Sequence, residues 1–78
     1  MRIIGVYDNE KTIDRYTVIF NEDNLFLCVS HNCNSPQGFS QSGQGKLQTK
    51  YLGKKIKFSE LPKHVQKHIK ERMEVKLK

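Results

Sequence analysis

A chain of 78 residues with a net charge of +6 is large enough for one domain, and its composition excludes several classes of protein. A single hydrophobic core of this size rarely contributes more than about 3 to 5 kcal/mol of stability, which favours self-association into a homo-oligomer. No apolar run approaches the roughly 18 residues needed to cross a bilayer. The N-terminal sequence MRIIGVYDNE also lacks the hydrophobic region and cleavage site of a signal peptide. We therefore expect one soluble, cytoplasmic domain spanning residues 1–78, with no membrane partner and with reduced cysteines at Cys28 and Cys33.

The charge is divided unevenly along the chain. Residues 1–45 carry three basic and five acidic side chains, a net charge of −2. Residues 46–78 carry eleven basic and three acidic side chains, a net charge of +8. Such polarity favours association with an anionic partner, although it does not predict a fold.

Alternation of apolar and polar residues in the first half predicts three β-strands. Residues 2–7 are apolar and rich in strand-forming types, and residues 13–20 place Tyr16 and Val18 on one face. Residues 25–29 resume the alternation after a turn rich in Asn and Asp. Three neighbouring strands joined by short turns indicate an antiparallel meander.

The second half predicts a long polar loop, a strand and a helix. Residues 30–49 are dominated by Ser, Asn, Gln and Gly, and loops of this length are either functional or disordered. Residues 54–58 read as another strand, and Ser59 has the character of a helix N-cap. Apolar residues then recur at four-residue spacing, as expected for an amphipathic helix: Leu61, Val65, Ile69 and Met73. The predicted fold is a small α+β domain, in which an antiparallel sheet of about four strands packs against one C-terminal amphipathic helix.

Three short motifs carry a resemblance to a known group of proteins. They are DRYTV at residues 14–18, SPQGFSQ at residues 35–41 and LGKKIKFSELPKHVQ at residues 52–66. Together they resemble small uncharacterised proteins of phages, prophages and other mobile elements. The resemblance implies a phage-type context, with action in the host cytoplasm, and it carries over no catalytic residue. A cysteine pair is not part of the group's pattern, so Cys28 and Cys33 depart from it.

A basic surface is the strongest functional signal. Lysines on the predicted strand and on the exposed side of the predicted helix would form one patch able to replace counterions on a phosphate backbone, and Tyr51 would add base stacking. These lysines are Lys54, Lys55, Lys57, Lys63, Lys67 and Lys70. Ordinary solvation of a helix face is the competing interpretation. Since lysine outnumbers arginine eleven to three, we expect no bidentate readout of bases. The sequence favours a non-enzymatic accessory protein that binds nucleic acid or an acidic host protein.

The polar loop suggests a second function. Backbone N–H groups of a glycine-rich segment can turn toward an anion, although GFSQSGQGKL does not satisfy the Walker pattern. The alternative is an oligomeric sponge that sequesters a small phosphorylated or nucleotide signal molecule of host anti-phage defence. Its predicted loop contacts are Asn34, Ser35, Gln37, Ser40, Gln41 and Lys46.

A structural zinc site is a further alternative. Cys28 and Cys33 could join His64 and His68, which lie one helical turn apart, in a tetrahedral site. The gap between the two pairs is far longer than the roughly 12 to 15 residues of a zinc finger, so we predict no metal ligand and no cofactor. No nucleophile with an oriented base is recognisable either, since His31 and Cys33 lack a third group, and we predict no enzymatic activity.

Overall fold

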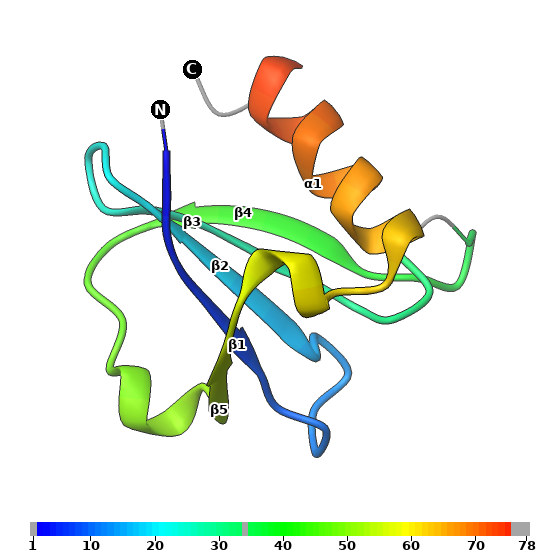
Figure 1. The fold of residues 1–78 in the computed structure, drawn as a ribbon, viewed down its shortest axis with the longest axis horizontal. Helices are drawn as coiled ribbons and strands as arrows, with labels where there is room; N and C mark the ends of the chain where they lie inside the picture. The colour runs from blue at the N-terminus through cyan, green and yellow to red at the C-terminus, as the bar shows by residue number, and fades with distance from the viewer. Residues whose placement is uncertain (1, 34, 76–78) are drawn as a thin grey trace.

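The structure, a computed structural model, describes residues 2–33 and 35–75 and confirms the predicted α+β class. Five antiparallel strands form one sheet in the order β4-β3-β2-β1-β5, and one helix lies across it (Figure 1). The strands are β1 (Ile3–Asp8), β2 (Tyr16–Phe20), β3 (Leu25–Val29), β4 (Ser40–Gln44) and β5 (Lys54–Ile56). The helical elements are two short 3-10 turns, η1 (Thr49–Tyr51) and η2 (Phe58–Glu60), and the helix α1 (Lys63–Val75). Within residues 2–33 and 35–75, no helix has the length and hydrophobicity needed to span a membrane.

Strands β1, β2 and β3 form the predicted meander, and polar side chains shape its turns. The side-chain oxygen of Asn9 accepts a hydrogen bond from the Lys11 backbone amide at 3.1 Å. The backbone amide of Asn9 donates to the Arg15 carbonyl oxygen at 2.7 Å. The second turn places Asp23 and Asn24 at φ angles of 52° and 55°. Asn and Asp tolerate this left-handed region better than other residues with a Cβ atom, so the turn matches its sequence.

The segment predicted as a polar loop contains a fifth strand, which corrects the sequence prediction for residues 30–49. Strand β4 pairs with β3 along the whole length of that strand, from Leu25 opposite Gln44 to Val29 opposite Ser40. Because β3 would otherwise leave a row of N–H and C=O groups unpaired at its outer edge, this pairing satisfies the backbone.

After β4 the chain crosses from one edge of the sheet to the other. It leaves β4 at Gly45, passes through η1 and enters β5, which pairs with β1 on the far side (Figure 1). Gly53 makes the entry to β5 possible, because its φ is 91° and a Cβ atom there would lie 2.3 Å from the Asp8 carbonyl oxygen.

The pairing register divides the side chains of the sheet between two faces. On the helix face, which α1 covers, one row runs Ile56–Val6–Val18–Leu27–Ser42 and another runs Lys54–Asp8–Tyr16–Val29–Ser40. On the back face, the rows run Gly5–Ile19–Phe26–Gly43 and Lys55–Tyr7–Thr17–Cys28–Gln41. Cross-strand partners share a face because successive residues of a strand point in opposite directions.

The core lies between the helix face and α1. Val18, Leu27, Val65 and Ile69 are completely buried there. Leu61 is also buried and Met73 packs at the edge, so the predicted apolar stripe is confirmed.

The helix begins later than predicted. Ser59 lies within η2 rather than at an N-cap, and Leu61 is extended, with φ −71° and ψ 149°. A residue before proline is forced out of the α region, so Pro62 delays the helix until Lys63.

Candidate functional site

Three of the predicted lysines form a stripe on the outer side of α1. Lys63, Lys67 and Lys70 are exposed, and their helical positions lie opposite the buried Val65 and Ile69. Glu71 and Glu74 follow Lys67 and Lys70 by one turn. Among the described residues, however, none of these ammonium groups is within ion-pair distance of a carboxylate. We call Lys63, Lys67 and Lys70 the α1 lysine stripe.

The other predicted cations do not all join this stripe. Lys54 and Lys55 are neighbours on β5 and therefore belong to opposite faces of the sheet. Lys57 lies after the end of β5, next to Phe58, and the centroid of the Phe58 ring is 5.8 Å from the Lys70 ammonium. Tyr51 is 67% exposed but belongs to η1, which lies at the opposite side of the molecule from α1 (Figure 1). The predicted single patch is thus divided.

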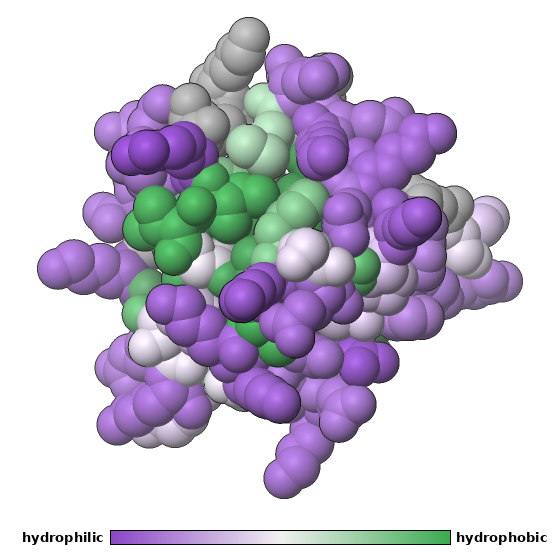
Figure 2. All heavy atoms as spheres, viewed as in Figure 1, coloured by the Kyte–Doolittle hydropathy of each residue, from purple (hydrophilic) through white to green (hydrophobic). Residues whose placement is uncertain are grey.

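The surface around α1 is mostly hydrophilic, and its main apolar area stands out among smaller ones (Figure 2). The apolar area lies beside the start of β1, where β5 is too short to cover the edge. Its side chains include Ile3, Ile4, Ile56 and Phe58, and Ile4 is 58% exposed.

The residues predicted as loop contacts are dispersed by the fold. Ser35 and Gln37 bond to each other in a tight turn, with 3.0 Å between Oγ and Oε1. Ser40 faces the helix and lies 2.8 Å from Nε2 of His68, whereas Gln41 belongs to the back face. Asn34 lies outside the described residues. The described residues of the predicted sponge site therefore do not lie together in the fold.

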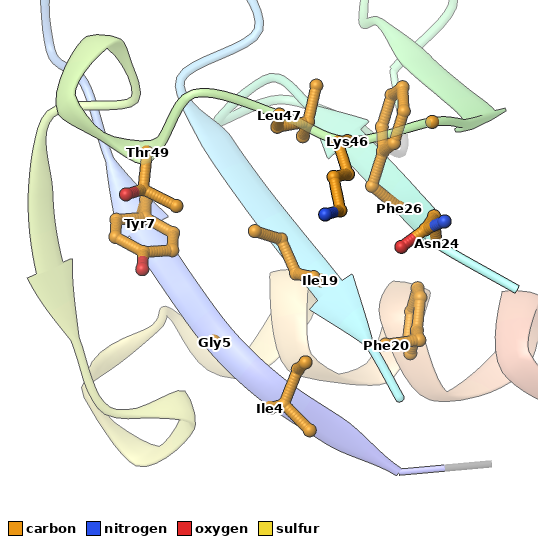
Figure 3. Close-up of a pocket in the computed structure, with 11 residues that line it drawn as sticks. Ile4, Gly5, Tyr7, Ile19, Phe20, Asn24, Phe26, Lys46, Leu47 and Thr49 are labelled. Carbon is orange, nitrogen blue, oxygen red and sulfur yellow. The ribbon is translucent and has the colours of Figure 1, made fainter. Parts of the chain in front are cut away.

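Lys46, the last predicted loop contact, lines a groove on the back face. The groove has a volume of about 330 Å³ and lies between the sheet and the crossing segment of residues 45–49 (Figure 3). Its apolar floor includes Ile19 and Phe26. Its polar groups come from Tyr7, Asn24, Lys46 and Thr49. Sequence reasoning identified Lys46 alone, because the other residues are distant in the chain and meet only through the crossing.

The four residues of the alternative zinc site lie in different parts of the fold. Cys28 belongs to the back face, whereas Cys33 is 8% exposed and packs in the core on the helix side. Across residues 2–33 and 35–75, no group of three or more His, Cys, Asp or Glu side chains is arranged to hold a metal ion. Both cysteines are free thiols, and burial raises the pKa of each, which disfavours the reactive thiolate.

A cluster of one tyrosine and two histidines, at the start of α1, was not recognised from the sequence. The Tyr16 hydroxyl lies 3.0 Å from Nδ1 of His31, and Nε2 of His64 lies 2.6 Å from the His31 carbonyl oxygen. The rings of His31 and His64 meet edge to face, with centroids 5.3 Å apart. These contacts connect α1 to the β3–β4 connection and to β2, which is sufficient to explain them as structural.

No known protein family, curated protein or solved structure matches this chain. The function is therefore inferred from the chemistry of these surfaces.

Proposed function

We propose that this protein is a non-enzymatic, phage-type accessory protein that binds nucleic acid through the α1 lysine stripe. One observation supports the proposal most directly: three exposed ammonium groups share one side of a helix, and no described carboxylate lies within ion-pair distance of them. Unpaired ammonium groups can replace the counterions condensed on a phosphate backbone, and release of those counterions favours binding.

The composition of the stripe favours phosphate over an acidic protein as its partner. Stable protein interfaces depend on apolar or aromatic anchors buried at their centre. The stripe is composed of exposed lysines and has no apolar side chain among its members, and the contact of Lys70 with the Phe58 ring lies within the protein. Lysine is a point charge without the planar fork that reads guanine, so contact would be independent of base sequence.

The experiment measures the salt dependence of binding to a mixed-sequence oligonucleotide, single-stranded or duplex, by fluorescence anisotropy. The wild-type affinity should fall steeply between about 50 and 200 mM salt. The variant Lys63→Gln/Lys67→Gln/Lys70→Gln should lower the magnitude of the log–log salt slope by about 2 to 3 on duplex DNA, because each lost phosphate contact contributes about 0.9. Glutamine keeps side-chain length and helix propensity, so the fold should persist.

A matched control removes the same charge elsewhere. Lys11, Lys50 and Lys55 are exposed and lie off α1, and Lys11→Gln/Lys50→Gln/Lys55→Gln should change the slope much less. Equal effects of the two triple variants would show that net charge, and not the stripe, drives binding. Absence of binding to both strand forms at low salt would contradict the proposal and leave an acidic protein as the partner to test.

A further inference from the structure

The back-face groove is separate from the α1 lysine stripe and has a different character. Its floor is one cross-strand row of the sheet, in which Ile19 and Phe26 are flanked by Gly5 on one side and Gly43 on the other. The two glycines contribute no side chain, so the row has two large apolar residues at its centre, and aromatic rings of neighbouring residues lie close to its two ends. The crossing segment of residues 45–49 lies over this row and converts an open sheet face into a groove (Figure 3).

The absence of side chains at both ends positions the aromatic rings of the groove. A Cβ atom on Gly43 would lie 2.5 Å from Cζ of Phe26, so the Phe26 ring occupies the space above Gly43. A Cβ atom on Gly5 would lie 3.1 Å from Cε1 of Tyr7. Both rings therefore lie close against glycine backbone, and both contribute to the groove wall.

The polar groups of the groove favour an anion. Figure 3 shows the Lys46 side chain extending over the groove with its amino group above Ile19. Asn24, on the rim, accepts a hydrogen bond from the Gly45 amide through its carbonyl oxygen at 2.9 Å, which ties the crossing to the β2–β3 turn. Among the described residues, neither the Lys46 ammonium nor the Asn24 side-chain amide contacts a polar partner, and no residue lining the groove is acidic. Lys46 is exposed and is the one residue with a positively charged side chain among the described residues that line the groove, so it can form a charge-assisted hydrogen bond to an anion there.

We propose that this groove binds a small phosphorylated molecule with a flat aromatic ring, of the nucleoside monophosphate class. The phosphate would accept hydrogen bonds from the Lys46 ammonium and the Asn24 amide, and the ring would lie against the apolar floor of the groove. The volume of about 330 Å³ is at the lower end of the range for small-molecule sites, which suits a mononucleotide better than a dinucleotide. This site shares only Lys46 with the loop site predicted from the sequence, and it does not depend on nucleic-acid binding by α1.

Isothermal titration calorimetry of the full chain with the monophosphates of adenosine, guanosine, cytidine and uridine tests the proposal. At least one should bind, and adenosine or inorganic phosphate alone should bind about tenfold more weakly, because each makes only part of the contacts. Lys46→Gln should weaken binding of the best nucleotide by about tenfold. Asn24→Asp should abolish it, since aspartate also tolerates the φ of 55° but brings a negative charge beside the phosphate.

Lys50→Gln is the matched control, because Lys50 is an exposed lysine of the same connection that stacks on Tyr51 and does not line the groove. It should bind the nucleotide as the wild type does, and circular dichroism should show the same fold for all variants. Three results would each overturn the proposal: none of the four nucleotides binds, Lys46→Gln and Lys50→Gln have equal affinities, or inorganic phosphate binds as tightly as the best nucleotide.

Discussion

The ring of Phe26 on β3 lies directly over Gly43 on β4, its cross-strand partner, so closely that a Cβ atom on Gly43 would be 2.5 Å from Cζ of the ring. The pair joins an edge strand without apolar side chains of its own to the apolar surface of the back face. A side chain at Gly43 would have to displace this ring, and the reason for glycine there is steric, since the backbone of Gly43 has no positive φ.

Gly43→Ala should therefore destabilise the protein by about 1 kcal/mol, the lower end of the cost of overpacking, because the Phe26 ring is only half-buried and must shift to admit the methyl group. Urea denaturation measures this change. In a Phe26→Ala background the same substitution should cost less than about 0.5 kcal/mol, because the clash is gone and the two effects are coupled. An unchanged cost in that background would mean that the Phe26 ring is not what excludes a side chain at Gly43.

Alanine substitutions at Gly53 and Gly45 distinguish the stability cost of backbone strain from the cost of steric contact. Both have positive φ, 91° and 145°, but a Cβ atom on Gly53 would lie 2.3 Å from the Asp8 carbonyl oxygen, whereas one on Gly45 would have no atom within 4 Å. Gly45→Ala should cost about 1 kcal/mol from conformation alone, and Gly53→Ala should cost at least about 1 kcal/mol more. Thermal or urea unfolding of the two variants makes the comparison. Equal losses of stability in the two variants would show that the close approach of Gly53 to β1 adds nothing to the cost of Gly53→Ala.

Burial of Ile69 holds α1 on the sheet. Ile69 is completely buried, so Ile69→Ala should destabilise the protein by about 2 to 5 kcal/mol, comparable to the whole stability expected of a domain this small. Circular dichroism should then show a largely unfolded chain at room temperature. Lys67→Ala, on the exposed side of the same helix, should stay within about 0.5 kcal/mol of the wild type. A folded Ile69→Ala protein of near wild-type stability would contradict the described packing of α1.

The stability of the fold should fall in mild acid because of His68. Burial lowers the pKa of His68 below its ordinary value of 6.5, the positive charge of Arg72 lowers it further, and Glu71 acts in the opposite direction. As pH falls below 6.5, the unfolded chain therefore takes up a proton at His68 before the folded protein does. The stabilising contribution is complete above this pH, declines below it, and levels off once the folded-state pKa is passed.

Urea denaturation at a series of pH values between about 7.5 and 5 measures this decline, because imidazole titrates in that range. His68→Gln keeps a polar side chain facing Ser40 and cannot titrate, so its stability should fall less over the same range. Identical pH profiles for the variant and the wild type would show that His68 is not the responsible group.

Much of the fold could be predicted from the sequence, because the relevant signals are local. The two-residue alternation around Tyr16 and Val18 and the four-residue spacing of Val65 and Ile69 depend on the period of a single element. Those side chains do line one core, and the α+β class follows from them. The uneven division of charge between the two halves and the presence of lysines on the helix could also be predicted from the sequence. The start of the helix was misplaced, because the restriction that Pro62 imposes on Leu61 outweighs the capping character of Ser59.

Only the tertiary structure decided the rest. Strand β4 has the sequence SQSGQ, which lacks apolar alternation, and it is a strand because the backbone edge of β3 needs a partner. The sheet register placed Lys54 and Lys55 on opposite faces, and the crossing of residues 45–49 brought Lys46 over Ile19. Backbone pairing and chain crossings join residues far apart in sequence, and side-chain periodicity within one element carries no record of them.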